Sequence, residues 1–160
     1  MAKEIKTNVM RILEQNKVEA QFYSYPCEEF IDGLAAAKAL NQPPERTFKT
    51  LVTQGKPRCY YVFVIPVAEE LDLKKAAKAA GEKSLEMIHV KDILSITGYI
   101  RGGCSPIGMK KRFPTFFHET CMDFATIFVS GGRIGTQVEV PPADLLRLCG
   151  GKAADLIVEA

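Results

Sequence analysis

Two neighbouring segments at residues 48–67 constrain the fold more than any other feature of the sequence. The second segment, RCYYVFVIPV (58–67), is apolar on both faces, which is typical of a central strand of a sheet. The first, FKTLVTQ (48–54), also reads as a strand, and the QGKP stretch between the two is a turn sequence. We therefore predict a β-hairpin with its second strand at the centre of a sheet.

Other apolar patterns predict further strands and helices in an irregular order. Strands are predicted at 20–25, 85–90, 115–119, 124–130 and 136–140, and residues 154–159 are predicted to form a strand or an extended tail. Helices are predicted at 4–15, 33–41, 72–80 and 141–149, with a helical turn at 91–97. Strands dominate the middle of the chain, and they do not alternate regularly with helices as they do in a doubly wound sheet. We predict a single α+β domain, residues 1–160, with helices outside a curved mixed sheet or barrel.

Charge and cysteine content narrow the class of protein. The chain has 21 basic and 19 acidic residues, a balance that does not require a nucleic-acid partner but leaves a local basic face open. Its 5 cysteines are odd in number and form no CxxC pair, and its 2 histidines lack metal-ligand spacing. We expect no disulfide framework, metal or cofactor. With no membrane-length apolar run and no signal-peptide pattern, we expect a cytoplasmic protein with reduced thiols.

The segment GYIRGGCSPIGMKKRFPT (98–115) has two interpretations. It is either an ordinary turn or a loop whose backbone N–H groups bind an anion or a carbonyl oxygen. Its basic residues Lys110, Lys111 and Arg112 are either a solvated surface run or nucleic-acid contacts. A second glycine-rich stretch, SGGRIG (130–135), reads as a turn or bulge. Neither matches a nucleotide-binding glycine motif.

Lys49 and Cys104 are the two individual residues that stand out as candidates for a role in a functional site. Strand alternation puts Lys49 on the same face as Leu51, with Thr50 on the opposite face. The lysine therefore lies either at a solvated edge or in a cleft, where its partly desolvated ammonium would need a polar or charged partner. Cys104 lies beside two glycines, as a nucleophile could, but no local base and no Ser–His–Asp set can be assembled around it.

Five segments of the chain occur in the same order in the YbaK family, which this sequence resembles from about residue 5 to 158. They are FKTLV (48–52), LDLKKAAKAAG (71–81), SITGYIRGG (95–103), SPIGMKKR (105–112) and FATIFVSGGRIG (124–135). The family belongs to a superfamily of aminoacyl-tRNA editing domains that includes the insertion domain of bacterial prolyl-tRNA synthetases. The resemblance implies that fold, no cofactor, and deacylation in trans of cysteine mischarged on proline tRNA, together with cysteinyl-tRNA(Cys).

The resemblance also implies roles for individual residues. Lys49, in its F-K-T context, matches the signature active-site residue, and Gly102 and Gly103 match the loop at the substrate, where their N–H groups would stabilise an oxyanion. The remaining residues implied to bind substrate are Tyr25, Thr50, Ser105, Pro106, Ser130 and Gly131. Cys104 stands where the family commonly has isoleucine, which argues further against a nucleophilic role.

The implied mechanism needs no protein nucleophile. The substrate thiol attacks its own ester carbonyl, a thiolactone leaves and the tRNA hydroxyl is released. Lys49 would bind the terminal phosphate or ribose, and Lys110, Lys111 and Arg112 would contact the acceptor stem. A prolyl-tRNA synthetase would present the tRNA. Two alternatives stay open: editing of another small amino acid such as alanine by water attack, and a tRNA- or synthetase-binding module without turnover. A DNA-binding regulator ranks last, because no basic recognition helix is evident.

Overall fold

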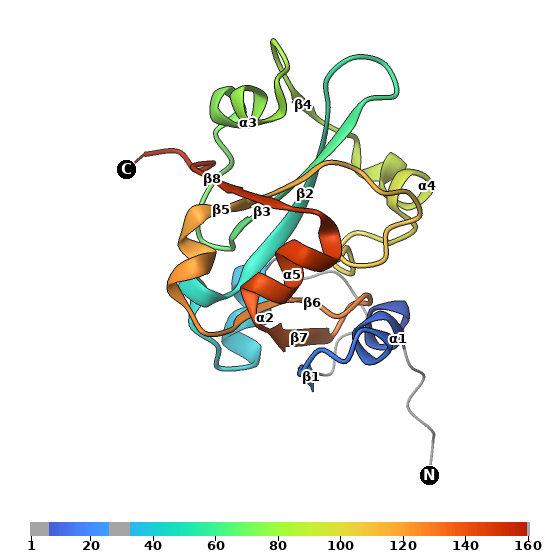
Figure 1. The fold of residues 1–160 in the computed structure, drawn as a ribbon, viewed down its shortest axis with the longest axis vertical. Coiled ribbons are helices and arrows are strands. Elements are labelled where there is room, and N and C mark those ends of the chain that lie inside the picture. Colours follow the sequence, from blue (N-terminus) through green and yellow to red (C-terminus); the bar gives the residue numbers. More distant parts are fainter. Residues whose placement is uncertain (1–6, 26–32, 160) are drawn as a thin grey trace.

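The protein folds into two β-sheets with helices around them, as the computed structural model shows for residues 7–25 and 33–159 (Figure 1). The helices are α1 (Asn8–Gln15), α2 (Gly33–Ala39), α3 (Leu73–Ala80), α4 (Ile93–Thr97) and α5 (Pro142–Cys149), with 3-10 turns η1 (Pro44–Arg46), η2 (Val90–Asp92) and η3 (Glu119–Asp123). The strands are β1 (Gln21–Ser24), β2 (Phe48–Gln54), β3 (Tyr60–Pro66), β4 (Glu86–Met87), β5 (Thr115–His118), β6 (Ile127–Ser130), β7 (Thr136–Val140) and β8 (Lys152–Ala154).

The larger sheet is mixed and the smaller one is antiparallel. The larger has the strand order β4-β2-β3-β5-β8, in which β3, β5 and β8 run parallel and β2 pairs antiparallel with both β3 and β4. The smaller has the order β1-β7-β6. The predicted α+β class with a mixed sheet is confirmed. The barrel alternative is not, because the described strands form two separate sheets.

Strand β3 is the centre of the larger sheet, as the sequence predicted. Its residues 62–66 are buried, and their side chains alternate between two apolar clusters. Val62 and Val64 belong to the cluster shared with β6, β7, α1 and α5, whereas Phe63 and Ile65 pack with α3. An apolar strand with no polar face needs cover on both sides, and the smaller sheet and α3 supply it.

The start of β2 is fixed where the two sheets meet. Thr47 forms a parallel bridge to Phe128 of β6. Just before it, the Arg46 guanidinium donates to the Thr126 carbonyl at 3.1 Å and to Glu139 of β7 at 3.2 Å, and lies 5.2 Å from the Phe128 ring centroid. Hydrogen bonds, chiefly from Thr126, hold the pKa of the Glu139 carboxyl below its usual value. This network anchors β2 two residues before Lys49.

Two segments differ in part from the sequence prediction. Of the two alternatives for 154–159, the extended tail is the one observed, because the strand β8 forms earlier, at Lys152–Ala154, directly after Gly150 and Gly151, and pairs with β5. The tail beyond it is instead held by single contacts, such as the Asp72 N–H donating to the Leu156 carbonyl at 2.8 Å. The strand predicted at 85–90 is limited to β4, after which η2 begins. Residues 4–6 of the first predicted helix lie outside the described residues.

None of the helices among the described residues is long and apolar enough to cross a membrane.

Candidate active site

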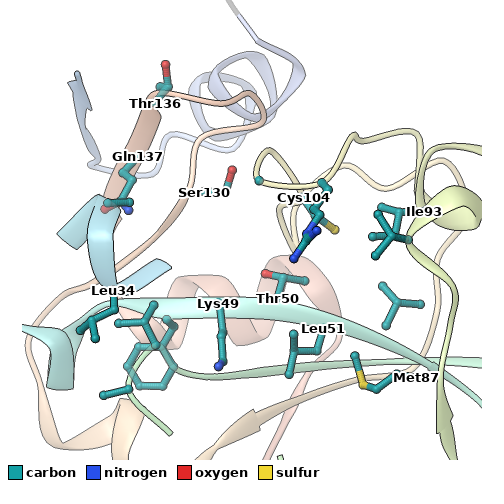
Figure 2. Close-up of a pocket in the computed structure, with 18 of the residues that line it drawn as sticks. Leu34, Lys49, Thr50, Leu51, Met87, Ile93, Cys104, Ser130, Thr136 and Gln137 are labelled. Atoms are coloured by element: carbon teal, nitrogen blue, oxygen red, sulfur yellow. The ribbon is translucent and has the colours of Figure 1, made fainter. Parts of the chain in front are cut away.

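A pocket of about 590 Å³ lies where β2, the loop after α4 and the β6–β7 hairpin meet (Figure 2). It brings together Lys49 and Thr50 of β2, Gly102 of the loop and Ser130 of β6, and Tyr25 also lines it. These five residues, distant in sequence, were predicted to share a site. Apolar side chains complete the walls, chiefly Leu34, Phe48, Leu51, Val52, Val67, Met87, Ile88, Val90 and Ile93.

The pocket follows an edge of β2 that no other described strand covers. Strand β4 pairs with β2 only at Thr53 and Gln54, and the last contact along this edge is the Ile88 N–H donating to the Val52 carbonyl at 3.2 Å. Backbone groups alternate in direction along a strand. The Thr47 carbonyl accepts a hydrogen bond from the Val67 N–H, so it points toward the β3 side of β2. Thr50 lies three residues further along β2, so its N–H and carbonyl point outward, away from β3, as those of Val52 do. The pocket therefore receives backbone as well as side-chain groups.

Lys49 and Thr50 enter the pocket from opposite sides of β2. Figure 2 shows Thr50 on the side of Ser130 and Cys104, with Lys49 and Leu51 on the other. This matches the alternation expected from the sequence. A ligand that lies across the strand edge would therefore meet the Lys49 ammonium on one side and the Thr50 hydroxyl on the other.

Two buried polar atoms of the pocket have no hydrogen-bond partner among the described residues. They are the Thr50 hydroxyl oxygen and the carboxamide oxygen Oε1 of Gln137, a β7 residue that is 8% exposed. Buried polar atoms are nearly always paired, so such atoms at a pocket wall point to groups that a ligand supplies. The Ser130 hydroxyl differs, because it accepts a 3.2 Å hydrogen bond from the Gly132 N–H.

The two glycine-rich loops pack directly against each other beside the pocket. A Cβ at Gly103 would lie 2.9 Å from Cα of Arg133, which is backbone that cannot swing away. Gly102 has φ of +86°, a conformation that glycine adopts without strain. Gly102 lines the pocket, whereas Gly103 permits the contact that positions it.

Three residues predicted to bind substrate are not among the lining residues of the pocket, and one of them, Pro106, lines a separate hollow. The Ser105 hydroxyl accepts from the Ile107 N–H at 3.3 Å, the Pro106 carbonyl accepts from the Cys149 thiol at 3.3 Å, and the Gly131 N–H donates to the Thr136 carbonyl at 2.8 Å. Each bond holds a loop in shape. The structure therefore gives Ser105, Pro106 and Gly131 a supporting position rather than a place among the lining residues.

The basic residues Lys110, Lys111 and Arg112 lie outside the lining of this pocket. Lys111 and Arg112 line a separate hollow of about 190 Å³. The Arg112 guanidinium donates to the Leu148 carbonyl at 3.3 Å, near the C-terminal end of α5, where a cation is favourable. The three cations are exposed and form a surface outside the lining of the pocket.

Cys104 lines the pocket but is not activated as a nucleophile. Burial raises the pKa of its thiol to about 11, and the opposing hydrogen bond with Thr97 is the smaller effect. The thiol therefore stays protonated near neutral pH, in agreement with the sequence interpretation. In the described part of the chain, no group of three histidine, cysteine or acidic side chains is arranged to hold a metal ion.

Sequence reasoning missed Gln137 and Arg101, both of which line the pocket. Gln137 could have been found by pairing the predicted strands 124–130 and 136–140 as a hairpin, because that pairing puts it opposite Ser130. Arg101 directly precedes Gly102, but nothing in its sequence context separates it from other surface arginines.

Comparisons with known proteins show the family to which the chain belongs. A family model described as the aminoacyl-tRNA editing domain matches residues 32–148. A protein of Enterococcus faecalis, provisionally named Cys-tRNA(Pro)/Cys-tRNA(Cys) deacylase EbsC, is 47% identical over 152 residues, which cover 94% of this chain and 93% of that protein.

Two solved structures share the fold. One, provisionally described as a trans-editing enzyme for prolyl tRNA synthetase, has a TM-score of 0.82 at 23% identity, over 98% of this chain and 100% of that chain. The other, a hypothetical protein, has a TM-score of 0.83 at 19% identity, over 94% and 99%. The family model covers more than half of the chain and the Enterococcus relative nearly all of it, so the chain belongs to the aminoacyl-tRNA editing domain family.

Proposed function

We propose that this protein is a deacylase that removes cysteine from mischarged tRNA(Pro), and from tRNA(Cys), in trans. The observation that carries the proposal is the pocket at the uncovered edge of β2, where Lys49, Thr50 and Gly102 converge. The 47% identical relative with this provisional name supports the choice of amino acid. The whole chain would act as one editing domain in the cytoplasm.

The residues of the pocket suit an ester that carries its own nucleophile. The cysteinyl sulfur attacks the ester carbonyl carbon, the bond to the ribose oxygen breaks, and the thiol proton ends on that oxygen. The products are a thiolactone, which water then opens, and a free tRNA end. The protein supplies orientation and donors for the developing oxyanion, from the Gly102 N–H and the outward N–H of Thr50. The Gly103 N–H, also predicted to serve as a donor, already donates to the Ile100 carbonyl at 3.0 Å. No protein nucleophile is required, and the protonated Cys104 thiol offers none.

Lys49 would bind the RNA and not act as a base. An ammonium next to phosphate keeps its proton, so it would hold the terminal phosphate or ribose and fix the ester at the β2 edge. Lys110, Lys111 and Arg112 would contact the acceptor stem from the adjacent surface. With a net charge of +2, binding of tRNA by the protein alone should be weak and sensitive to salt. A prolyl-tRNA synthetase that presents its product would compensate.

The experiment that tests this function measures ester loss from Cys-tRNA(Pro), Ala-tRNA(Pro) and Pro-tRNA(Pro), with wild type and Lys49→Ala. We expect loss of the cysteinyl ester alone and none with the variant. Loss of the alanyl ester would show that water attacks, since alanine has no thiol. If tRNA binds and every ester survives, the protein is a binding module and the proposal is wrong.

A further inference from the structure

Gln137 is a buried polar residue of the pocket whose oxygen the fold leaves without a partner. Its side chain comes from β7, opposite Ser130 of β6, and is 8% exposed. Its Oε1 atom accepts no hydrogen bond from the part of the chain that the structure describes. Leaving an acceptor buried and unpaired destabilises a fold, so its presence at a pocket wall is explained if a ligand donates to it.

The chemistry of a carboxamide oxygen limits which ligand group can fill this place. Oε1 can only accept, so it cannot bind the ester carbonyl, which also only accepts. Of the groups on an aminoacyl ester, the α-amino group is the strong donor, and its hydrogen bonds are reinforced when it is charged. A cysteine thiol is a weak donor.

The described lining of the pocket combines charged and neutral polar side chains. Among the described residues that line the pocket, the charged side chains are Lys49 and Arg101, and Gln137 contributes a neutral acceptor. Figure 2 shows Gln137 and Leu34 at one end of the pocket, with Met87 and Ile93 at the other and Lys49 and Thr50 between them.

We propose that Gln137 accepts a hydrogen bond from the α-amino group of the aminoacyl ester and is a specificity-determining residue for it. The inference rests on the proposed deacylase function. The ester would then lie over the β2 edge with its amino group toward β7. The pocket would distinguish an aminoacyl ester from an acyl ester of the same shape that lacks the amino group.

The test uses two esters that differ only in that group. Cysteinyl-tRNA(Pro) is compared with 3-mercaptopropionyl-tRNA(Pro), which keeps the thiol and lacks the amino group, and each enzymatic rate is divided by the spontaneous rate. Wild type is compared with Gln137→Met, which preserves length and removes the acceptor, and with Gln137→Glu, which keeps an acceptor. The control is Gln42→Met, because Gln42 is also 8% exposed with an unpaired carboxamide but does not line the pocket.

We expect Gln137→Met to lower kcat/KM for the cysteinyl ester about tenfold to a hundredfold and to leave the mercaptopropionyl ester unchanged. Gln137→Glu should keep the preference for the cysteinyl ester, and Gln42→Met should leave both rates at the wild-type value. Equal loss for both esters, or no loss for either, would overturn the role of Gln137. If wild type cleaves neither ester, the deacylase proposal itself fails, which is a different result.

Discussion

The loop after α4 contributes residues to the pocket and also carries the basic surface, and the two regions differ in how their polar groups are satisfied. Gly102 and Cys104 line the pocket, whereas Lys110, Lys111 and Arg112, a few residues further along the chain, do not. In the pocket, Thr50 and Gln137 keep buried atoms without partners. On the surface, Arg112 is bonded to the end of α5 and all three cations are exposed.

This difference indicates two kinds of binding. Buried, unpaired groups in a fixed frame suit recognition of one small chemical structure, because a ligand that lacks the matching group leaves them unsatisfied. Exposed cations suit attraction to a polyanion of any sequence, and salt screens that attraction. Substitutions in each region should therefore have different effects on catalysis, on stability and on the salt dependence of tRNA binding.

Replacing Lys49 with alanine should have the largest effect. Without the ammonium at the β2 edge the ester loses its fixed position, and kcat/KM for cysteinyl-tRNA should fall at least about 100-fold. The measurement is single-turnover deacylation. Cys104→Ala is the control from the same pocket and should act close to wild type, because that thiol is protonated. A variant Lys49→Ala with normal activity would remove Lys49 from the site.

Adding a side chain at Gly103 should separate the two glycine-rich loops. A Cβ at Gly103 would lie 2.9 Å from Arg133 backbone, so Gly103→Ala should cost about 1–3 kcal/mol of unfolding free energy and lower activity as well. Thermal denaturation and deacylation measure the two effects. Gly55→Ala is the matched control, because its Cβ would meet the end of the Glu82 side chain, at 2.8 Å, and no backbone atom among its nearest neighbours. Equal effects of the two substitutions would contradict the loop contact.

Thr50→Val should lower activity without lowering stability. The substitution keeps the branched shape and removes a hydroxyl that has no partner, so the protein should stay as stable while kcat/KM falls about tenfold. Thr53→Val on the same strand should do the reverse, because the Thr53 hydroxyl donates to the Tyr61 carbonyl at 3.1 Å. Its unfolding free energy should drop by about 1 kcal/mol. If both variants behave alike, the Thr50 hydroxyl has no part in binding.

Removing Lys110 and Lys111 together should have the smallest effect at physiological salt. Each lost phosphate contact should reduce the slope of log affinity against log salt by about 0.7–0.9, with kcat unchanged. The measurement is tRNA binding over a range of salt concentrations. The exposed lysines Lys74 and Lys78 of α3 give a control of equal charge. The same change of slope in both pairs would mean that the basic surface contacts no particular part of the tRNA.

Much of the frame could be predicted from local patterns. The hairpin of β2 and β3 follows from an apolar run and a turn sequence, and the opposite facing of Lys49 and Thr50 follows from strand alternation. The membership in the editing family, inferred from ordered motifs, is confirmed. These features follow from residues that are adjacent in sequence, or from motifs that the chain shares with a known family.

The rest depends on contacts distant in sequence. Strand β8 is built from lysine and alanine, which do not favour strands, and forms because β5 offers an edge. The pocket exists because β4 stops at Met87 and leaves β2 uncovered, which no local pattern indicates. Ser105 and Pro106 belong to the loop motif, but the structure uses them to brace the loop.

The uncovered edge of β2 also suggests how the protein could be inhibited. Sheet edges accept extended peptides, which add main-chain hydrogen bonds as a further strand would. The outward N–H and carbonyl of Thr50 offer one such pair between Thr47 and Val52. We expect short peptide mimics with a donor and an acceptor in backbone spacing, and a thioether in place of the reactive thiol, to compete with substrate there.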